Sequence, residues 1–333
     1  MGQWWLGFIV LVVALLWLDL GVLNRHNRVM GTREALRWTA LWVSVSLAFN
    51  VFVYFLYERR LGGFQSTLGG WDAAKVFFAG YLLEYSLSLD NVFVIALIFQ
   101  YFAVPPASQH RALFWGILGA LIFRGVMIVA GAALLGRFEW MMYVFGAILL
   151  LTAIRMLRSD NEQVEPEHNP LVRFARRVYP VSSAYDGARM FTRLPDGRWA
   201  MTPLFLVLLV IESTDVIFAV DSIPAVFGVT REPFIVFTSN IFAILGLRSL
   251  YFVLAGMMRR FHHVKTSLIF VLAFIAVKML LAEHVHISID ASLAVLATAI
   301  GLGVVASLLS APPRTPEEEE LADESRLPLD GEG

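Results

Sequence analysis

Two stretches of the chain place carboxylates inside otherwise apolar runs: "EYSLSLDN" at residues 84–91 and "ESTDVIFAVDS" at residues 212–222. Charged side chains within membrane spans cost roughly 2.5–3.5 kcal/mol each on insertion scales, and they usually mark pathways for ions or protons. Side chains with oxygen atoms suit Mg²⁺, Ca²⁺ and Mn²⁺. The pattern therefore predicts a site for a hard divalent cation. Its candidate ligands are Glu84, Asp90, Asn91, Glu212, Asp215, Asp221 and Ser222.

Basic side chains in the same apolar runs offer a structural alternative, in which the acids only form buried ion pairs. Arg124 and Arg248 both lie inside apolar runs and are assigned as counter-charges. Arg155 and Lys278 lie nearer the ends of their runs, from which long basic side chains can reach water. Five acids against two central arginines leave an excess of negative charge. A bound cation or protonation would neutralise this excess, so cation binding is the favoured hypothesis.

The spacing of the acids makes a prediction about helix geometry. On a regular helix, Glu84 and Asp90 point about 120° apart, and Asp221 points about 180° away from Glu212. One straight helix therefore cannot direct all its acids at one ion. Pro224 frees the carbonyl four residues earlier from its helical hydrogen bond. We expect a break or kink near Asp221, with exposed carbonyls as added ligands, and a similar irregularity near Asp90.

The elements that carry these residues are membrane-spanning helices. The chain is 58% hydrophobic and 16% charged, and several apolar runs reach the roughly 20 residues that a helix needs to cross a bilayer. This predicts an all-α polytopic membrane protein embedded in the lipid bilayer, with its first apolar run retained as a helix. The nine predicted spans are about 4–22, 36–57, 73–100, 112–135, 140–157, 202–223, 232–257, 267–283 and 290–310.

Composition also excludes several functions. The 333 residues contain no cysteine, which rules out disulfides and thiolate metal sites within them. A net charge of −1 does not point to nucleic acid as a partner. The sequence has no nucleophile elbow, phosphate loop or zinc-protease motif, so we do not expect an enzyme.

The basic residues predict the orientation in the membrane. Arg and Lys gather in the connections between spans one and two, five and six, and seven and eight. With nine spans these three connections lie on one side, and cytoplasmic connections carry the excess of basic residues. The N-terminus is therefore expected outside and the C-terminus inside.

Self-similarity predicts a duplication. "EYSLSLDNVFV" aligns with "DVIFAVDSIPA", "LIFRGVMIVAG" with "LGLRSLYFVLAG", and "AILLLTAIRML" with "VLAFIAVKMLL", in the same order. These matches pair Glu84 with Asp215, Asp90 with Asp221 and Arg124 with Arg248. Because three is odd and the units are adjacent, the two three-helix units must have inverted topologies, as in many secondary transporters.

The resulting organisation has six parts. The connection between the repeats contains "NPLVRFARRVYP", a predicted amphipathic helix, and "MFTRLPDGRWAM", a predicted hairpin, and the acidic end of the chain is predicted to be disordered. The parts are two N-terminal helices in 1–60, repeat 1 in 72–157, a cytoplasmic loop in 158–200, repeat 2 in 201–283, a last helix in 288–310 and the acidic tail in 311–333.

At "EYSLSLDNVFV" and "DVIFAVDSIPAVF" the chain resembles the TerC family of bacterial membrane proteins, including its Alx branch. The resemblance covers most of the chain, and "AVDSIPA" with an acid six residues earlier is a specific signature. It implies that the seven candidate ligands match the family's motif positions. It also implies manganese export across the bacterial cytoplasmic (inner) membrane, a relation to lysine-exporter-type transporters and a link to tellurite resistance.

These observations together suggest a secondary exporter of Mn²⁺, with proton antiport as the expected coupling. A Ca²⁺ or Mg²⁺ carrier is one alternative, and a membrane scaffold that binds metal without moving it is another. In the exporter hypothesis Asp90 and Asp221 are the central ligands, and Asn91 and Ser222 lie beside them.

Overall fold

The computed structural model describes residues 2–18, 31–61, 66–158, 169–255, 262–285 and 287–310. The predicted acidic tail, 311–333, lies outside these residues. Apart from one small hairpin, the described elements are helices. In chain order they are α1 (Gly2–Trp17), α2 (Thr32–Glu58), α3 (Gly70–Tyr101), α4 (Pro106–Arg137), α5 (Met141–Arg158), α6 (Pro170–Val178), β1 (Phe191–Arg193), β2 (Trp199–Met201), α7 (Pro203–Val229), α8 (Pro233–Leu245), α9 (Leu247–Ala255), α10 (His262–Leu280) and α11 (Ile289–Leu309).

Seven of the described helices are long and apolar enough to cross a membrane: α2, α3, α4, α5, α7, α10 and α11. The bent pair of α8 and α9 brings the number to eight if the pair forms one span. The remaining apolar helix, α1, is shorter than this criterion requires. The chain is therefore an all-α, multi-pass membrane protein with seven or eight candidate spans among its described residues.

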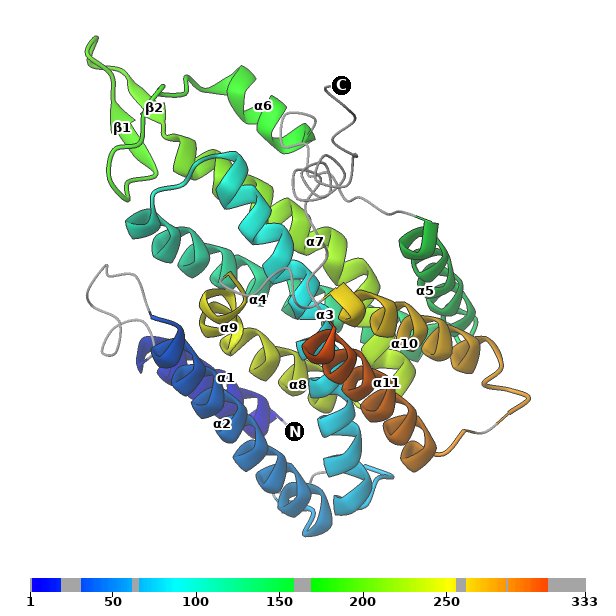
Figure 1. Ribbon diagram of the computed structural model, residues 1–333. Helices are drawn as coiled ribbons and strands as arrows, with labels where there is room; N and C mark the ends of the chain where they lie inside the picture. The colour runs from blue at the N-terminus through cyan, green and yellow to red at the C-terminus, as the bar shows by residue number, and fades with distance from the viewer. Residues whose placement is uncertain are drawn as a thin grey trace, which may run out of the picture.

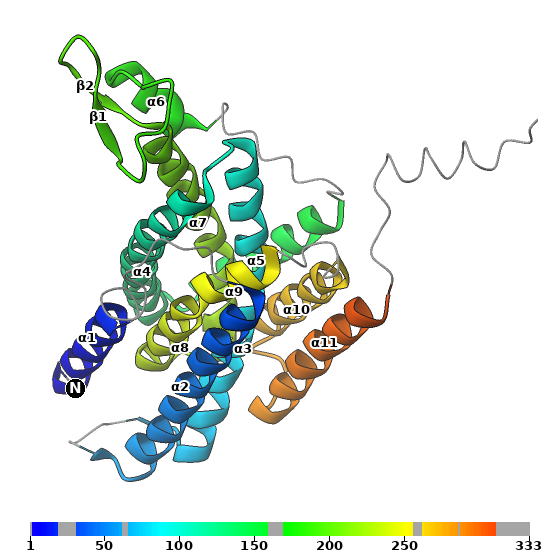
Figure 2. The ribbon, with the colours of Figure 1, turned by 60° about the vertical axis from the view of Figure 1, so that its left-hand side comes forward.

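Helix α3 is the centre of the bundle (Figures 1 and 2). It packs against α2, α7, α8, α9, α10 and α11. Its apolar residues occur on all sides, which is typical of a helix that is surrounded by others. Helix α7 lies along both α3 and α4. The two acid-bearing helices, α3 and α7, are thus neighbours in the interior of the protein.

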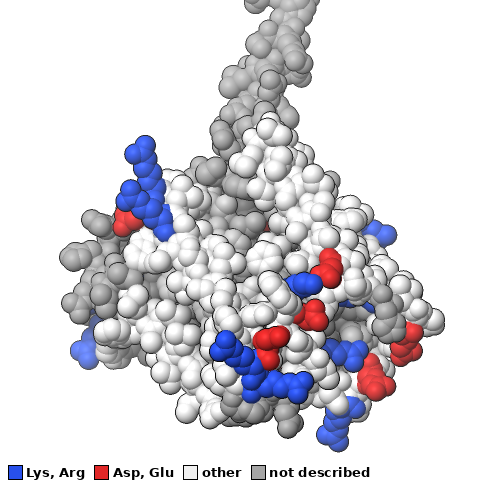
Figure 3. All heavy atoms as spheres, turned by 90° about the horizontal axis from the view of Figure 1, so that it is seen from below, with Lys and Arg blue, Asp and Glu red and all other residues white. Residues whose placement is uncertain are grey.

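The outer surface fits an apolar environment. Large apolar side chains on the outer helices are more than half exposed, among them Leu6, Val51, Val126, Val129 and Leu302. Figure 3 shows that most of the surface on one face is uncharged, with Lys, Arg, Asp and Glu gathered in a few clusters. Such a surface would be unfavourable in water and is suited to lipid.

The described part of the connection between α5 and α7, residues 169–202, forms a small unit at one end of α7 (Figure 1). It contains the short helix α6 and the antiparallel strand pair β1–β2, in which Thr192 lies opposite Ala200. Gly197 adopts a φ of +84° in the turn between the strands, a conformation that glycine accepts without strain. Val172 of α6 is buried in the same apolar cluster as Leu206 and Val210 of α7.

The break predicted near Asp221 is wrong, and α3 is likewise unbroken at Asp90. Helix α7 continues through Pro224 to Val229, and α3 continues through Asp90 and Asn91. A proline is tolerated within a membrane helix where neighbouring groups compensate for the lost hydrogen bond, and Pro224 is buried among other helices. The bend lies elsewhere: α8 and α9 meet at 43° around Gly246, two residues before Arg248.

The start of α3 depends on a close approach to α2. Gly70 donates its backbone N–H to Glu58 Oε2 at 3.0 Å. A Cβ at this position would lie 2.6 Å from the Tyr54 carbonyl oxygen and 2.7 Å from Glu58 Cβ. The backbone of α2 cannot move away as a flexible side chain could, so the two helices would have to separate.

We therefore expect Gly70→Ala to lower the free energy of unfolding by about 1–3 kcal/mol, which is typical of overpacking. Gly69→Ala is the matched control, because a Cβ there meets nothing within 4 Å and should change stability by less than about 0.5 kcal/mol. Thermal unfolding in detergent, followed by tryptophan fluorescence, compares the two variants. Equal midpoints would contradict the close-packing explanation.

Candidate functional site

A buried arginine joins the two acid-bearing helices. Arg124 of α4 is 1% exposed and forms ion pairs with Glu84 of α3 and Asp215 of α7. Its Nη2 lies 3.0 Å from Asp215 Oδ1, its Nε donates to Asp215 Oδ2 at 3.4 Å, and its Nη1 donates to Ser222 Oγ at 3.4 Å. The forked guanidinium suits such a multidentate contact. One positive charge therefore serves two carboxylates.

Glu212 lies apart from this ion-pair cluster, at the interface of α7 with α4. Its carboxylate occupies the space that a Cβ on Gly119 would need. Its Oε2 is buried and has no hydrogen-bond partner among the described residues. Glycine at position 119 is thus what lets a carboxylate lie against the backbone of α4.

Asp90 and Asp221 line one large cavity, which we call the wide cavity. Its volume is about 950 Å³, and its walls come from α3, α5, α7 and α10. Leu151 and Ile217 on these walls are 67% and 64% exposed, so the cavity is open to its surroundings. Oxygen and nitrogen groups on its walls come from Asp90, Asn91, Thr152, Arg155, Arg158, Asp221 and Ser222.

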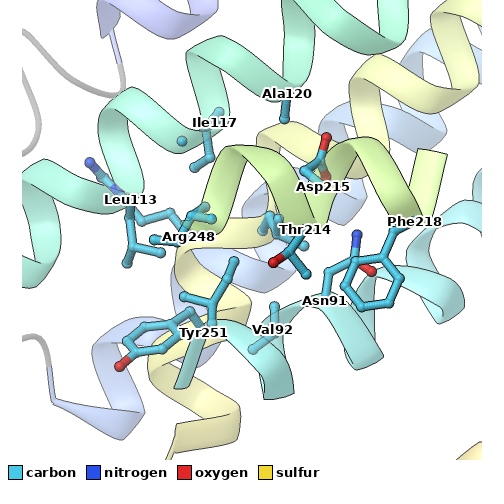
Figure 4. A pocket seen from close by; sticks show the side chains of 14 residues that line it. Asn91, Val92, Leu113, Ile117, Ala120, Thr214, Asp215, Phe218, Arg248 and Tyr251 are labelled. Carbon is cyan, nitrogen blue, oxygen red and sulfur yellow. The ribbon is translucent and has the colours of Figure 1, made fainter. Parts of the chain in front are cut away.

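A much smaller cavity, of about 20 Å³, lies deeper between α3, α4, α7 and α9 (Figure 4). This narrow cavity has space for about one water molecule. Asn91, Thr214, Asp215 and Arg248 contribute polar groups to its lining, and most of the other lining residues are apolar. In Figure 4 the Arg248 guanidinium lies well to the side of the Asp215 carboxylate. The predicted duplication matches Arg124 with Arg248, but their surroundings differ, because Arg124 is the one paired with Asp215.

The two cavities share part of their walls. Asn91 and Phe218 line both the wide and the narrow cavity. Ser222 lines the wide cavity and also accepts a hydrogen bond from Arg124. A thin partition of side chains therefore separates Asp90 and Asp221 from the cluster around Arg124.

The structure thus divides the predicted ligands into three places. Asp90, Asn91, Asp221 and Ser222 lie at the wide cavity, Glu84 and Asp215 at Arg124, and Glu212 beside Gly119. This follows from continuous helices, because residues six apart on a regular helix point in different directions. Among the described residues, no three acidic or histidine side chains come together as a metal-binding group. A cation in the wide cavity would have two carboxylates, with neutral oxygens and water as further ligands.

Sequence reasoning missed Thr152 of α5. Its Oγ1 donates to Asp221 Oδ1 at 2.7 Å, and it lines the wide cavity with Arg155. The two residues are three positions apart and so share one helix face. That spacing was visible in the sequence, but nothing there indicated which helix would lie opposite Asp221.

Comparisons with known proteins identify the family to which the sequence belongs. Residues 69–315 match the family described as "Integral membrane protein TerC family". The membrane protein STKORF319 of Myxococcus xanthus is 46% identical over 305 residues, covering 92% of each chain. The "Putative membrane-bound redox modulator Alx" of Salmonella typhi is 44% identical over 308 residues, covering 92% of this chain and 91% of that protein.

The protein of the same name from Escherichia coli K12 is 43% identical over 292 residues, covering 87% of this chain and 89% of that protein. No solved structure is significantly similar. The region matched by the family begins at the start of α3 and includes both acidic motifs, Arg124 and Arg248. The chain therefore belongs to the TerC family of integral membrane proteins.

Proposed function

We propose that this protein is a secondary transporter that exports a divalent metal cation, and that the ion is Mn²⁺. The observation that carries the proposal is the pair Asp90 and Asp221 on the walls of one open cavity within a membrane protein. Acidic side chains within membrane-spanning helices are costly, and they commonly mark pathways for ions or protons. Asp90 comes from α3 and Asp221 from α7, so a bound ion would bridge the two helices.

The donor set supports a hard cation. Asn91, Thr152 and Ser222 add neutral oxygens to the two carboxylates, and water can complete the coordination shell. The chain has no cysteine to favour soft metals. Mn²⁺ is chosen over Ca²⁺ and Mg²⁺ because of the resemblance to manganese-exporting members of the TerC family.

Proton antiport would follow from the same carboxylates. A protonated carboxylate binds a metal less strongly, so proton entry would release the ion. Arg124 would keep Glu84 and Asp215 together when the cavity holds no cation. Glu212 would be a further site for a proton, since its Oε2 is buried without a hydrogen-bond partner among the described residues.

Alternating access would come from two inverted repeats. One unit would be α3, α4 and α5, and the other α7, the bent pair α8–α9, and α10. Rocking one unit against the other would open the central region to each side in turn. In this proposal the N-terminus is outside and the C-terminus is cytoplasmic, in the bacterial inner membrane.

A second candidate comes from the printed name of the Alx relatives, which describes them as redox modulators. This chain could not act in that way through thiols of its own, because its 333 residues contain no cysteine. It would have to act indirectly, for example by changing the supply of a metal. A metal-binding scaffold that moves no ion is the corresponding non-transport alternative.

Purified protein in liposomes tests the proposal directly. We expect Mn²⁺ to enter vesicles that contain a manganese-quenched dye, and we expect a pH gradient to change the rate. Mg²⁺ and Ca²⁺ in excess show which ion the cavity prefers. Calorimetric binding of Mn²⁺ without any uptake above that of empty liposomes would instead support the scaffold, and neither binding nor uptake would rule out both.

A further inference from the structure

Helix α6 has three distinct faces. At about 100° per residue, Leu171, Phe174 and Val178 fall within one arc of about 60°. Their side chains are 46%, 65% and 62% exposed. Val172 lies about 130° from the middle of that arc and is buried in the core shared with α7. The helix is thus fixed to the protein along one face and presents apolar side chains along another.

The third face is basic. Arg173, Arg176 and Arg177 lie on the remaining side of α6 and are exposed. None of the three has an acidic partner within the described part of the chain. Other arginines of the same connection are neutralised: Arg189 pairs with Asp186 at 3.3 Å, and Arg198 pairs with Asp196 at 2.6 Å. The charge of α6 is therefore available to a partner outside this set of residues.

A short helix with an exposed apolar stripe and adjacent arginines fits the boundary between lipid headgroups and acyl chains. The apolar stripe would lie in the boundary, and the arginines would contact phosphate groups. We propose that α6 binds the anionic headgroup layer of the bilayer, and that Asn169 transmits this contact to the acid-bearing helix α7.

Asn169 connects α6 to α7 through hydrogen bonds of its side chain. Its Oδ1 accepts hydrogen bonds from the backbone N–H groups of Leu171 at 2.9 Å and Val172 at 3.4 Å, which caps the start of α6. Its Nδ2 donates to Ser213 Oγ of α7 at 2.6 Å. Both ends of one amide are therefore engaged, one with each helix. Ser213 directly follows Glu212 and lies two residues before Asp215. A movement of α6 would therefore displace the part of α7 that carries the acidic motif.

The lipid contact can be tested without any transport measurement. Since the chain lacks cysteine, Phe174→Cys provides a single labelling position for an environment-sensitive dye. In vesicles with phosphatidylglycerol we expect a blue shift and about threefold less quenching by an aqueous quencher than in phosphatidylcholine vesicles, since each basic side chain strengthens binding to an anionic surface by roughly fivefold. High salt should reduce the difference.

Replacing Arg173, Arg176 and Arg177 by Gln in the labelled protein should abolish the effect of lipid charge. Arg189→Gln with Arg198→Gln is the control, because these arginines are also exposed but are already paired. The backbone N–H and guanidinium of Arg198 hold the pKa of the Asp196 carboxyl below its usual range, so this partner stays ionised at neutral pH. The proposal would be overturned if the dye signal were the same in anionic and neutral vesicles, or if it changed only when an acidic protein was added.

The link to α7 rests on the proposed transport function and has its own test. We expect anionic lipid to change the rate of Mn²⁺ uptake at least about twofold, and Ser213→Ala to remove this dependence while the dye at position 174 still responds to lipid. Ser213→Ala leaves the Oδ1 cap of α6 intact. Unchanged lipid dependence in Ser213→Ala would overturn the link alone. No uptake by the wild type, with a normal dye response, would count against transport and leave the lipid contact standing.

Discussion

Arg124→Ala is expected to destabilise the folded protein by about 3–5 kcal/mol, the cost of removing one partner from a buried ion pair. Glu84 is 0% exposed and Asp215 9% exposed, so neither carboxylate could gain much hydration in place of the guanidinium. The loss should appear as a lower midpoint of thermal unfolding in detergent. It should also appear as a smaller monodisperse fraction in size-exclusion chromatography.

Two further variants separate lost charge from lost packing. Arg124→Lys keeps the charge but lacks the planar fork, so it should recover only part of the stability. Arg124→Ala combined with Glu84→Gln and Asp215→Asn removes all three charges and should be more stable than Arg124→Ala alone. If this neutral triple variant were as unstable as the single variant, packing and not charge would explain the role of Arg124.

Much of the fold could be predicted from apolar run length, because a bilayer fixes the length of a spanning helix. The acid-bearing runs were correctly placed in helices α3 and α7. The bend at Gly246 could not be predicted, since glycine is common in membrane helices and nothing local distinguishes this one. Pro224 was misleading, because the energetic cost of its missing hydrogen bond depends on neighbouring helices, which the sequence does not specify.

The residues of the candidate site could be predicted from the sequence, but their separation into three places could not. The azimuth of Glu84 relative to Asp90 indicated that they could not meet at one point on a straight helix. The sequence could not show whether the helix would bend or the acids would separate, and the structure has them separate. Which of Arg124 and Arg248 pairs with Asp215 depends on how α4 and α9 approach α7, and two matched sequences cannot distinguish these approaches.

Asp90→Asn and Asp221→Asn are each expected to reduce Mn²⁺ uptake to the level of empty liposomes. Each should weaken Mn²⁺ binding by at least about tenfold, or about 1.4 kcal/mol. The reason is that the wide cavity offers these two carboxylates, and losing one removes half of the negative charge available to a divalent ion. Asparagine keeps the size and one oxygen of the side chain, so folding should be preserved and thermal midpoints should change little.

Two further variants serve as controls. A change at Arg155 should strengthen Mn²⁺ binding, and a change at Asp290 should leave Mn²⁺ uptake unaffected. Arg155 lines the wide cavity with Asp221, so Arg155→Gln removes a repelling charge and should strengthen Mn²⁺ binding by about two- to tenfold. Asp290 pairs with Lys75 at 2.5 Å, is exposed and lies outside the wide cavity; Asp290→Asn should leave uptake unchanged. Each of these four variants removes one charge, but the expected effects on Mn²⁺ differ in direction. A general effect of removing charge therefore cannot produce the whole pattern. Uptake that survives in both Asp90→Asn and Asp221→Asn would move the ion pathway away from the wide cavity, toward the cluster of Glu84, Asp215 and Arg124.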